Sequence, residues 1–138
     1  MTRKTISLFS ALLLLPAFVL AGDNSAQPDF RGTWSGTLFS RHSNVAPFTM
    51  TIVIGPNAQG DLVGNSTLSS DCLKGAHLQA TVTASKIVLA GSDREGDNIT
   101  VRGVMDKSGT VLAVTYILNG SATGQCETDD GTGNLGKR

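Results

Sequence analysis

The stretch that decides the fold is FTMTIVI, residues 48–54. Its even-numbered positions carry Phe, Met, Ile and Ile, and its odd-numbered positions carry Thr, Thr and Val. Successive side chains of an extended strand point to opposite faces, so a repeat of two separates an apolar face from a more polar one. The segment therefore predicts a half-buried β-strand whose Phe, Met and Ile side chains face a core.

The same alternation recurs along the chain, broken by clusters of Gly, Asn, Asp and Ser, and no stretch has the period of an amphipathic helix. An all-β chain is predicted. The expected strands are residues 30–39, 48–54, 61–68, 76–83, 86–91, 98–105, 111–118 and 131–137. Short connections between successive strands imply antiparallel neighbours.

Eight antiparallel strands can close on themselves, which removes the exposed edges that an open sheet must protect. The expected outer face carries Thr, Ser, Lys and Asn, which differs from the apolar outer band of a membrane barrel. The fold prediction is therefore an eight-stranded antiparallel up-and-down barrel. The alternative is a β-sandwich, but the immunoglobulin pattern needs a Trp between two cysteines, and Trp34 precedes both Cys72 and Cys126.

Residues 1–21 have the pattern of a secretory signal peptide. Arg3 and Lys4 precede an apolar run at 6–20, and Val-Leu-Ala at 19–21 fits a cleavage site. The run is shorter than the roughly 20 residues that span a bilayer. We expect export to the periplasm or the extracellular space, with no membrane span after signal removal.

The remainder divides into a flexible lead-in at 22–29, which is polar and contains Pro28, and a single β-barrel domain at 30–138. Without Arg3 and Lys4, nine basic residues face 11 acidic ones, and the basic residues are scattered along the chain. A nucleic-acid-binding protein usually shows a basic stripe. Nucleic acid is therefore not an expected partner.

Cys72 and Cys126 are the only cysteines, and an exported chain meets an oxidising compartment, so a disulfide between them is predicted. On the chain-entropy model such a bridge stabilises the fold by about 4 kcal/mol. A zinc site would need two further ligands, and only His42 and His77 are available, without the usual spacing. No metal and no cofactor is expected.

Alternating strand directions place the connections at two ends of the barrel. Tight turns at 55–60, 84–85 and 106–109 share one end, and longer segments at 40–46, 69–75, 92–97 and 119–128 share the other. Loops on a rigid scaffold often carry binding residues, so the long-loop end is the expected ligand or partner surface. The candidate contact residues there are Arg41, His42, Asn44, Asp71, Lys74, Arg94 and Glu95.

The sequence Gly32-Thr33-Trp34, on the first expected strand, resembles the Gly-x-Trp signature of the calycin superfamily, which includes lipocalins and avidins. The resemblance implies that Trp34 lies near the closed end of a barrel, with a basic residue close to the last strand over its ring. Lys137 or Arg138 would fill that position, and a cation over an indole contributes about 0.5 to 2 kcal/mol. Only the architecture carries over, because avidins bind biotin with several tryptophans and this chain has one.

Inward positions are mostly Leu, Ile, Val and Ala, and Gly36, Gly64 and Ser66 leave some room among them. The sequence is therefore compatible with two kinds of barrel interior. Either the small residues open a narrow apolar pocket at the long-loop mouth, or the larger ones fill the barrel. The small number of aromatic residues favours a filled or small interior.

No set of residues assembles an acid, a base and a nucleophile, so no enzyme and no catalytic residue is predicted. The first functional hypothesis is an exported binding barrel that holds a small, largely apolar ligand at its long-loop end. The alternative is a protein-recognition module, such as an inhibitor of a secreted hydrolase. The sequence leaves the ligand, the partner and the oligomeric state open.

Overall fold

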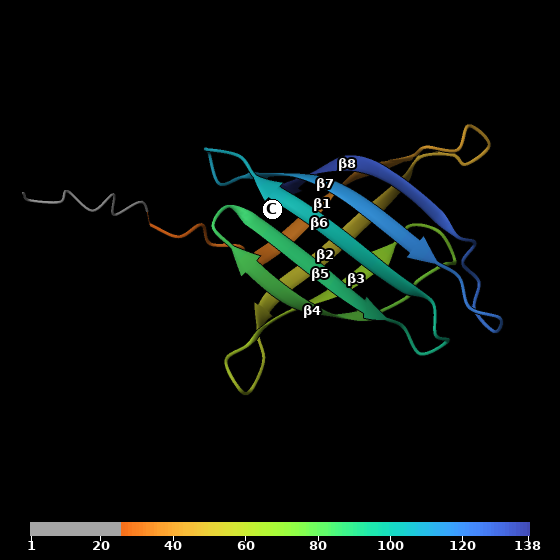
Figure 1. Ribbon diagram of the computed structural model, residues 1–138, viewed down its shortest axis with the longest axis horizontal. Helices are drawn as coiled ribbons and strands as arrows, with labels where there is room; N and C mark the ends of the chain where they lie inside the picture. Colours follow the sequence, from red (N-terminus) through yellow and green to blue (C-terminus); the bar gives the residue numbers. More distant parts are fainter. Residues whose placement is uncertain (1–25) are drawn as a thin grey trace, which may run out of the picture.

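The computed structural model describes residues 26–138, and the predicted signal peptide and residues 22–25 lie outside the described part. It contains the strands β1 (Gly32–Ser40), β2 (Phe48–Pro56), β3 (Leu62–Leu68), β4 (Ala76–Thr83), β5 (Lys86–Ser92), β6 (Asn98–Met105), β7 (Val111–Asn119) and β8 (Asp129–Lys137). Each strand pairs antiparallel with the next, and β8 pairs with β1 to close a barrel (Figure 1). The predicted all-β, eight-stranded up-and-down barrel is confirmed, and the sandwich alternative is excluded.

Three strand boundaries differ from the sequence prediction by two residues, and four others differ by one. β2 extends to Pro56 instead of residue 54. β1 begins at Gly32 instead of residue 30, because the backbone bends at Gly32, whose φ is +125°. This conformation favours glycine, and it turns Phe30 away from the ladder. β8 begins two residues early, at Asp129, which pairs with Leu118 of β7.

The inward face is the one that the alternation predicts. Met50, Ile52 and Ile54 are buried, whereas Val53 between them is 50% exposed. The same pattern holds along β7, where Leu112, Val114, Tyr116 and Leu118 are buried and their neighbours are exposed. The register of the barrel is therefore fixed by burial of one face of each strand.

Side chains fill the barrel interior, and the two inward glycines do not open it. A Cβ at Gly64 would lie 3.2 Å from both Ile52 Cγ2 and Leu89 Cδ2, so these side chains already occupy the space beside it. A Cβ at Gly36 would overlap the carbonyl oxygen of Asn134, because the β1 and β8 backbones approach closely there. The expectation that these glycines leave room is wrong for that reason.

The two ends of the barrel differ as predicted. In Figure 1 the β2–β3, β4–β5 and β6–β7 turns lie at the left with the C-terminus, and the other four connections lie at the right. We call these the closed end and the open end. The β5–β6 connection at the open end is itself compact, since the Asp93 N–H donates to the Asp97 carbonyl at 2.9 Å.

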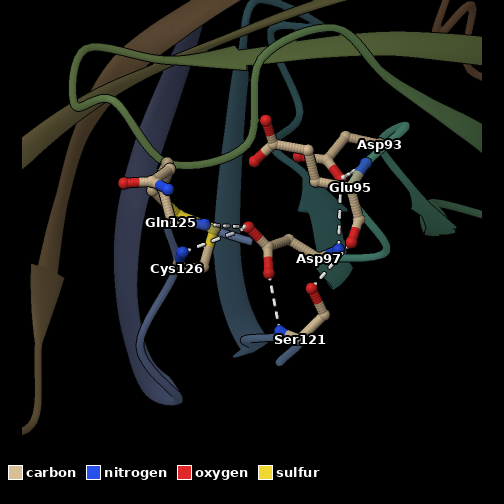
Figure 2. Close-up of a disulfide and its surroundings, with 7 residues drawn as sticks. Asp93, Glu95, Asp97, Ser121, Gln125 and Cys126 are labelled. Atoms are coloured by element: carbon tan, nitrogen blue, oxygen red, sulfur yellow. Dashed lines mark hydrogen bonds between the residues drawn. A yellow bond between two sulfur atoms is a disulfide. The ribbon is translucent and has the colours of Figure 1, made fainter. Parts of the chain in front are cut away.

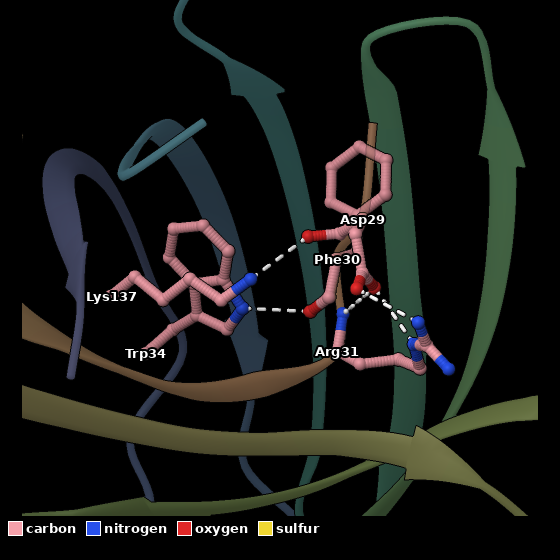
Figure 3. A network of polar contacts seen from close by, with 5 residues as sticks. All are labelled: Asp29, Phe30, Arg31, Trp34 and Lys137. Atoms are coloured by element: carbon pink, nitrogen blue, oxygen red, sulfur yellow. Dashed lines mark hydrogen bonds and ion pairs between the residues drawn. The ribbon is translucent and has the colours of Figure 1, made fainter. Parts of the chain in front are cut away.

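Phe30 and Trp34 seal the closed end (Figure 3). Both side chains are buried, and the indole Nε1–H of Trp34 donates to the carbonyl oxygen of Phe30 at 2.8 Å. Lys137 Nζ lies 5.4 Å from the centroid of the Trp34 ring and donates to the carbonyl oxygen of Asp29 at 3.1 Å. This is the arrangement that the calycin resemblance implies for Lys137. Arg138 is exposed and contributes only its backbone N–H, to Thr33.

The segment before β1 is tied to this end by polar contacts. The guanidinium of Arg31 donates to both carboxylate oxygens of Asp29, at 2.8 and 2.9 Å. This hydrogen-bonded ion pair holds the pKa of Asp29 below its ordinary range. Asp29, the last residue of the predicted lead-in, thus contacts the barrel through Lys137.

Candidate functional site

The disulfide joins two loops at the open end. Cys72 of the β3–β4 loop is bonded to Cys126 of the β7–β8 loop, and their Cα atoms are 4.7 Å apart. Leu73, beside the bridge, has a φ of 53° and is only 1% exposed. A left-handed Leu is strained, and burial of its side chain in the core offsets the strain. The β3–β4 loop is thereby drawn inward over part of the barrel mouth.

A buried carboxylate, Asp97, holds the β7–β8 loop from the other side (Figure 2). It accepts three backbone N–H groups, from Ser121 at 2.6 Å, Gln125 at 2.9 Å and Cys126 at 3.1 Å. Asp97 is fully buried. Burial alone would raise its pKa, but the backbone donors, Ser121 foremost, hold the pKa below its ordinary value of 3.8.

The β7–β8 loop has a conformation that accommodates the Asp97 carboxylate. A Cβ at Gly124 would overlap the Asp97 carboxylate, so only glycine fits there. The hydroxyls of Ser121 and Thr123 donate to the Glu95 carbonyl at 2.7 and 2.9 Å. Together with the disulfide, these contacts fix the β7–β8 loop to both the β5–β6 and the β3–β4 connections.

A cavity of about 350 Å³ opens at the mouth of the barrel, between the β1–β2 loop and the strand ends around it. We call it the mouth cavity. Its apolar lining comes from Val45, Ala46, Pro47, Phe48, Leu68 and Leu118. Its polar lining comes from Ser69, Ser70, Cys72, Glu127, Thr128 and Asp129. The lining thus combines apolar side chains with two carboxylates, Glu127 and Asp129, over a filled interior.

Asp129, at the start of β8, is the most buried charged group of this lining, with 6% of its surface exposed. It accepts hydrogen bonds from the Ser40 hydroxyl at 2.5 Å and from the Tyr116 hydroxyl at 2.6 Å. Within residues 26–138 it forms no ion pair with Lys, Arg or His. A nearly buried carboxylate is therefore held by two neutral donors at the edge of a cavity.

Tyr116, one of the two donors to this carboxylate, is itself held by an aromatic contact. Its ring packs edge to face on Phe48, with 5.5 Å between the centroids and 74° between the planes. Burial, followed by the hydrogen bond to Asp129, raises the pKa of the phenol well above its ordinary value. The Tyr116 hydroxyl thus keeps its proton and donates a hydrogen bond to Asp129, as buried tyrosine hydroxyls usually do to a polar partner.

None of the loop residues proposed from the sequence lines the mouth cavity. Arg41 and His42 both face Asp130, with Arg41 Nη1 3.1 Å from Oδ2 and His42 Nε2 3.4 Å from Oδ1. Asn44 is exposed farther along the same loop.

The other four proposed residues border a separate, polar depression of about 440 Å³, beside the disulfide-linked loops. They are Asp71, Lys74, Arg94 and Glu95. Asp71 and Lys74 form an exposed ion pair at 2.9 Å. We call this depression the charged depression.

Sequence reasoning did not single out Asp97, Tyr116 or Asp129. One signal was available: Tyr116 is the only tyrosine in the chain, and it occupies an inward position whose hydroxyl requires a partner. That partner could not be identified from the alternation alone.

No protein-family model matches this sequence, and a search of curated proteins found no similar sequence. Among residues 26–138 there is no helix long and apolar enough to cross a membrane. The same residues contain no group of three or more His, Cys, Asp or Glu side chains placed to hold a metal ion. Function therefore has to be argued from the geometry of the open end.

Proposed function

We propose that this chain is an exported, non-enzymatic binding barrel that holds a small, largely apolar molecule in the mouth cavity. The observation that carries the proposal is an open cavity of about 350 Å³ above a filled barrel. Small-molecule sites begin at roughly 300 Å³ and combine an apolar lining with a few placed polar groups. The mouth cavity has both properties.

The way in which the cavity is framed supports the proposal. Cys72 itself lines the cavity, and Glu127, which also lines it, follows Cys126 in the β7–β8 loop. The disulfide and the Asp97 hydrogen bonds order these loops before any ligand arrives. Binding to ordered loops avoids the entropic cost of fixing them.

The closed barrel also fits the calycin architecture, which the Gly32-Thr33-Trp34 segment and Lys137 resemble. We include a calycin-like relationship in the proposal, limited to the architecture. A ligand at the open mouth, opposite a sealed end, agrees with that architecture.

The test is a titration of ¹⁵N-labelled protein with 2-phenylethanol, a neutral probe with one ring and a short chain. We expect its saturable amide shifts to cluster at residues 46–48, 68–70 and 127–129. Ser70→Trp should obstruct the cavity with a large side chain, because Ser70 lines it and is itself exposed. Gln59→Trp, at the exposed turn of the closed end, is the matched control.

Loss of the shifts in Ser70→Trp, with retention in Gln59→Trp, supports a ligand site at the mouth. Shifts that scatter over the surface, or that survive in Ser70→Trp, contradict it. So does the absence of any saturable shift at millimolar probe.

The second candidate function is a protein-recognition module, such as an inhibitor of a secreted hydrolase. The charged depression favours it, because Lys74, Arg94 and Glu95 are exposed on ordered loops there. Its test is a binding screen against hydrolases secreted in the same environment, repeated with Arg94→Ala. A partner that loses affinity for this variant supports it, and the absence of any partner counts against it.

A further inference from the structure

The charge of the mouth cavity identifies the chemical class of its ligand. We propose that the mouth cavity binds a cation on an apolar body, with a protonated amine or guanidinium resting on Asp129. This inference rests on the proposed function, since it specifies the ligand of the same site.

The first step is the incomplete compensation of Asp129. An ionised carboxylate offers about four acceptor positions, and here two are taken by the hydroxyls of Ser40 and Tyr116. Buried charges in proteins are usually paired with an opposite charge, yet Asp129 makes no ion pair within the described residues. A cation that enters the cavity would supply the missing charge and use the free acceptor positions.

The second step is the sign of the charges around the cavity. The only charged residues in its lining are Glu127 and Asp129, and both are acidic. The two basic residues of the β1–β2 loop, Arg41 and His42, face Asp130. Acidic groups beside low-dielectric walls focus a negative potential inside a cleft, which raises the local concentration of cations.

The third step is the apolar half of the lining. Phe48, Leu68 and Leu118 face the same cavity as the two carboxylates. A simple metal ion or ammonium would leave this surface unused, whereas an aromatic or branched aliphatic body would cover it. The favoured ligand thus combines a cationic end with a compact apolar end, on the scale of a ring and a short chain.

The protonation state of Tyr116 is consistent with this assignment. The phenol is protonated at neutral pH, as a tyrosine with the ordinary pKa of about 10 already is, and its hydroxyl donates to the carboxylate at 2.6 Å, so it does not compete with the carboxylate for a cation. Hydrogen bonds that involve a charged partner are shorter and stronger than neutral ones. The Ser40 and Tyr116 hydroxyls therefore hold Asp129 by hydrogen bonds and bring no positive charge to it.

The test compares three probes that share a phenyl ring: phenethylamine, 2-phenylethanol and 3-phenylpropionate. Affinities are measured by amide shifts at residues 46–48, 68–70 and 127–129, at low ionic strength. We expect phenethylamine to bind about tenfold more tightly than the alcohol, because a charge-assisted hydrogen bond replaces a neutral one. The carboxylate probe should bind most weakly.

Asp129→Asn keeps the shape of the side chain and removes its charge, and it should abolish the preference for the amine over the alcohol. Glu95→Gln is the matched control, since Glu95 is an exposed carboxylate at the open end that does not line the mouth cavity; it should change the preference by less than about threefold, because solvent screens exposed charges. The carboxyl ¹³C shift of Asp129 in the unmodified protein should respond to the amine and not to the alcohol. This measurement tests the inference even where Asp129→Asn fails to fold.

Equal binding of the amine and the alcohol at the mouth would overturn the cation assignment and leave the proposed function standing. An Asp129 carboxyl shift that does not change when the amine is added would also overturn the cation assignment and leave the proposed function standing. If no probe shifts the mouth residues, the proposed function itself fails.

The cation could belong to a free small amine or to a Lys or Arg side chain of another protein. Competition with the capped peptide acetyl-Gly-Arg-Gly-amide distinguishes these sources. Displacement of phenethylamine from the mouth by the peptide supports the assignment with a protein side chain as the source, and persistence of bound phenethylamine supports it with a free amine.

Discussion

The closed end and the open end of this barrel are stabilised in different ways. At the closed end Phe30 and Trp34 are buried, and the polar atoms that accompany them find partners at 2.8 and 3.1 Å. At the open end the loops are held by a disulfide and by the Asp97 carboxylate, while Asp129 borders a cavity. Side chains that pack inward seal the closed end, whereas cross-linked loops surround the mouth cavity at the open end.

This difference predicts that the two ends of the barrel respond to different perturbations. Apolar packing responds to loss of volume and little to redox state or acid. A cross-link and a charged hydrogen-bond acceptor respond to reduction and to protonation. Conditions that loosen the open end should therefore leave the closed end intact, which separates ligand binding from the rest of the fold.

The largest effect is expected from removal of the bridge. Cys72→Ser with Cys126→Ser should lower the free energy of unfolding by about 4 kcal/mol, because the loop that the bridge closes gains freedom in the unfolded chain. Urea unfolding measures the loss. Amide exchange of the folded variant should quicken first in the β3–β4 and β7–β8 loops. An unchanged unfolding midpoint, or exchange that quickens first around Trp34, would contradict the contrast between the two ends.

The second effect is at the closed end. Phe30→Ala should lower the free energy of unfolding by about 3 kcal/mol, because it leaves a cavity where a fully buried ring packs. Phe39→Ala is the matched control, since Phe39 is 54% exposed, and its cost should stay within about 0.5 kcal/mol. Equal costs for the two variants would show that Phe30 does not seal the barrel.

Much of this architecture could be predicted from the sequence because a barrel strand encodes its two faces by alternation. Met50, Ile52 and Val53 needed no tertiary information to be assigned to the inside or the outside. The two ends followed from the lengths of the connections, and the cysteines fell at the same end. These features are local, or nearly so.

The residues that hold the open end and the mouth cavity could not be found in that way. Asp97 acquires its role from backbone N–H groups more than 20 positions away, and Asp129 from Ser40, 89 positions away. Aspartate also disfavours strands, so the start of β8 was placed after Asp129 and Asp130. The sequence-based candidates were exposed polar residues of the loops, whereas the cavity is lined by four strand-end residues and by other residues of those loops.

The third prediction concerns acid. The pKa of Asp97 is below 3.8 in the folded protein, so its contribution to stability is complete above the unfolded pKa and is lost as the pH falls towards the folded pKa. Asp97→Asn should lower the melting temperature at neutral pH, by less than Phe30→Ala does. The difference from the unmodified protein should shrink as the pH falls below about 4.

The comparison must be between variants, because the pKa values of Asp29, Asp71 and Asp106 are lowered too. Glu95→Gln is the matched control, since its side chain is exposed beside Asp97. A melting difference for Asp97→Asn that stays constant down to pH 2 would show that the carboxylate charge does not hold the loop.

The smallest effect tests the polar part of the closed end. Lys137→Met keeps an apolar stem over Trp34 but removes the cation and the hydrogen bond to the Asp29 carbonyl, and it should cost about 1 kcal/mol. Lys107→Met, on the exposed β6–β7 turn, is the control and should cost almost nothing. Fluorescence of Trp34, the only tryptophan, reports the change directly, while phenethylamine binding at the mouth should be unaffected. A loss of binding in Lys137→Met would mean that the two ends are coupled, against the independence argued from their structures.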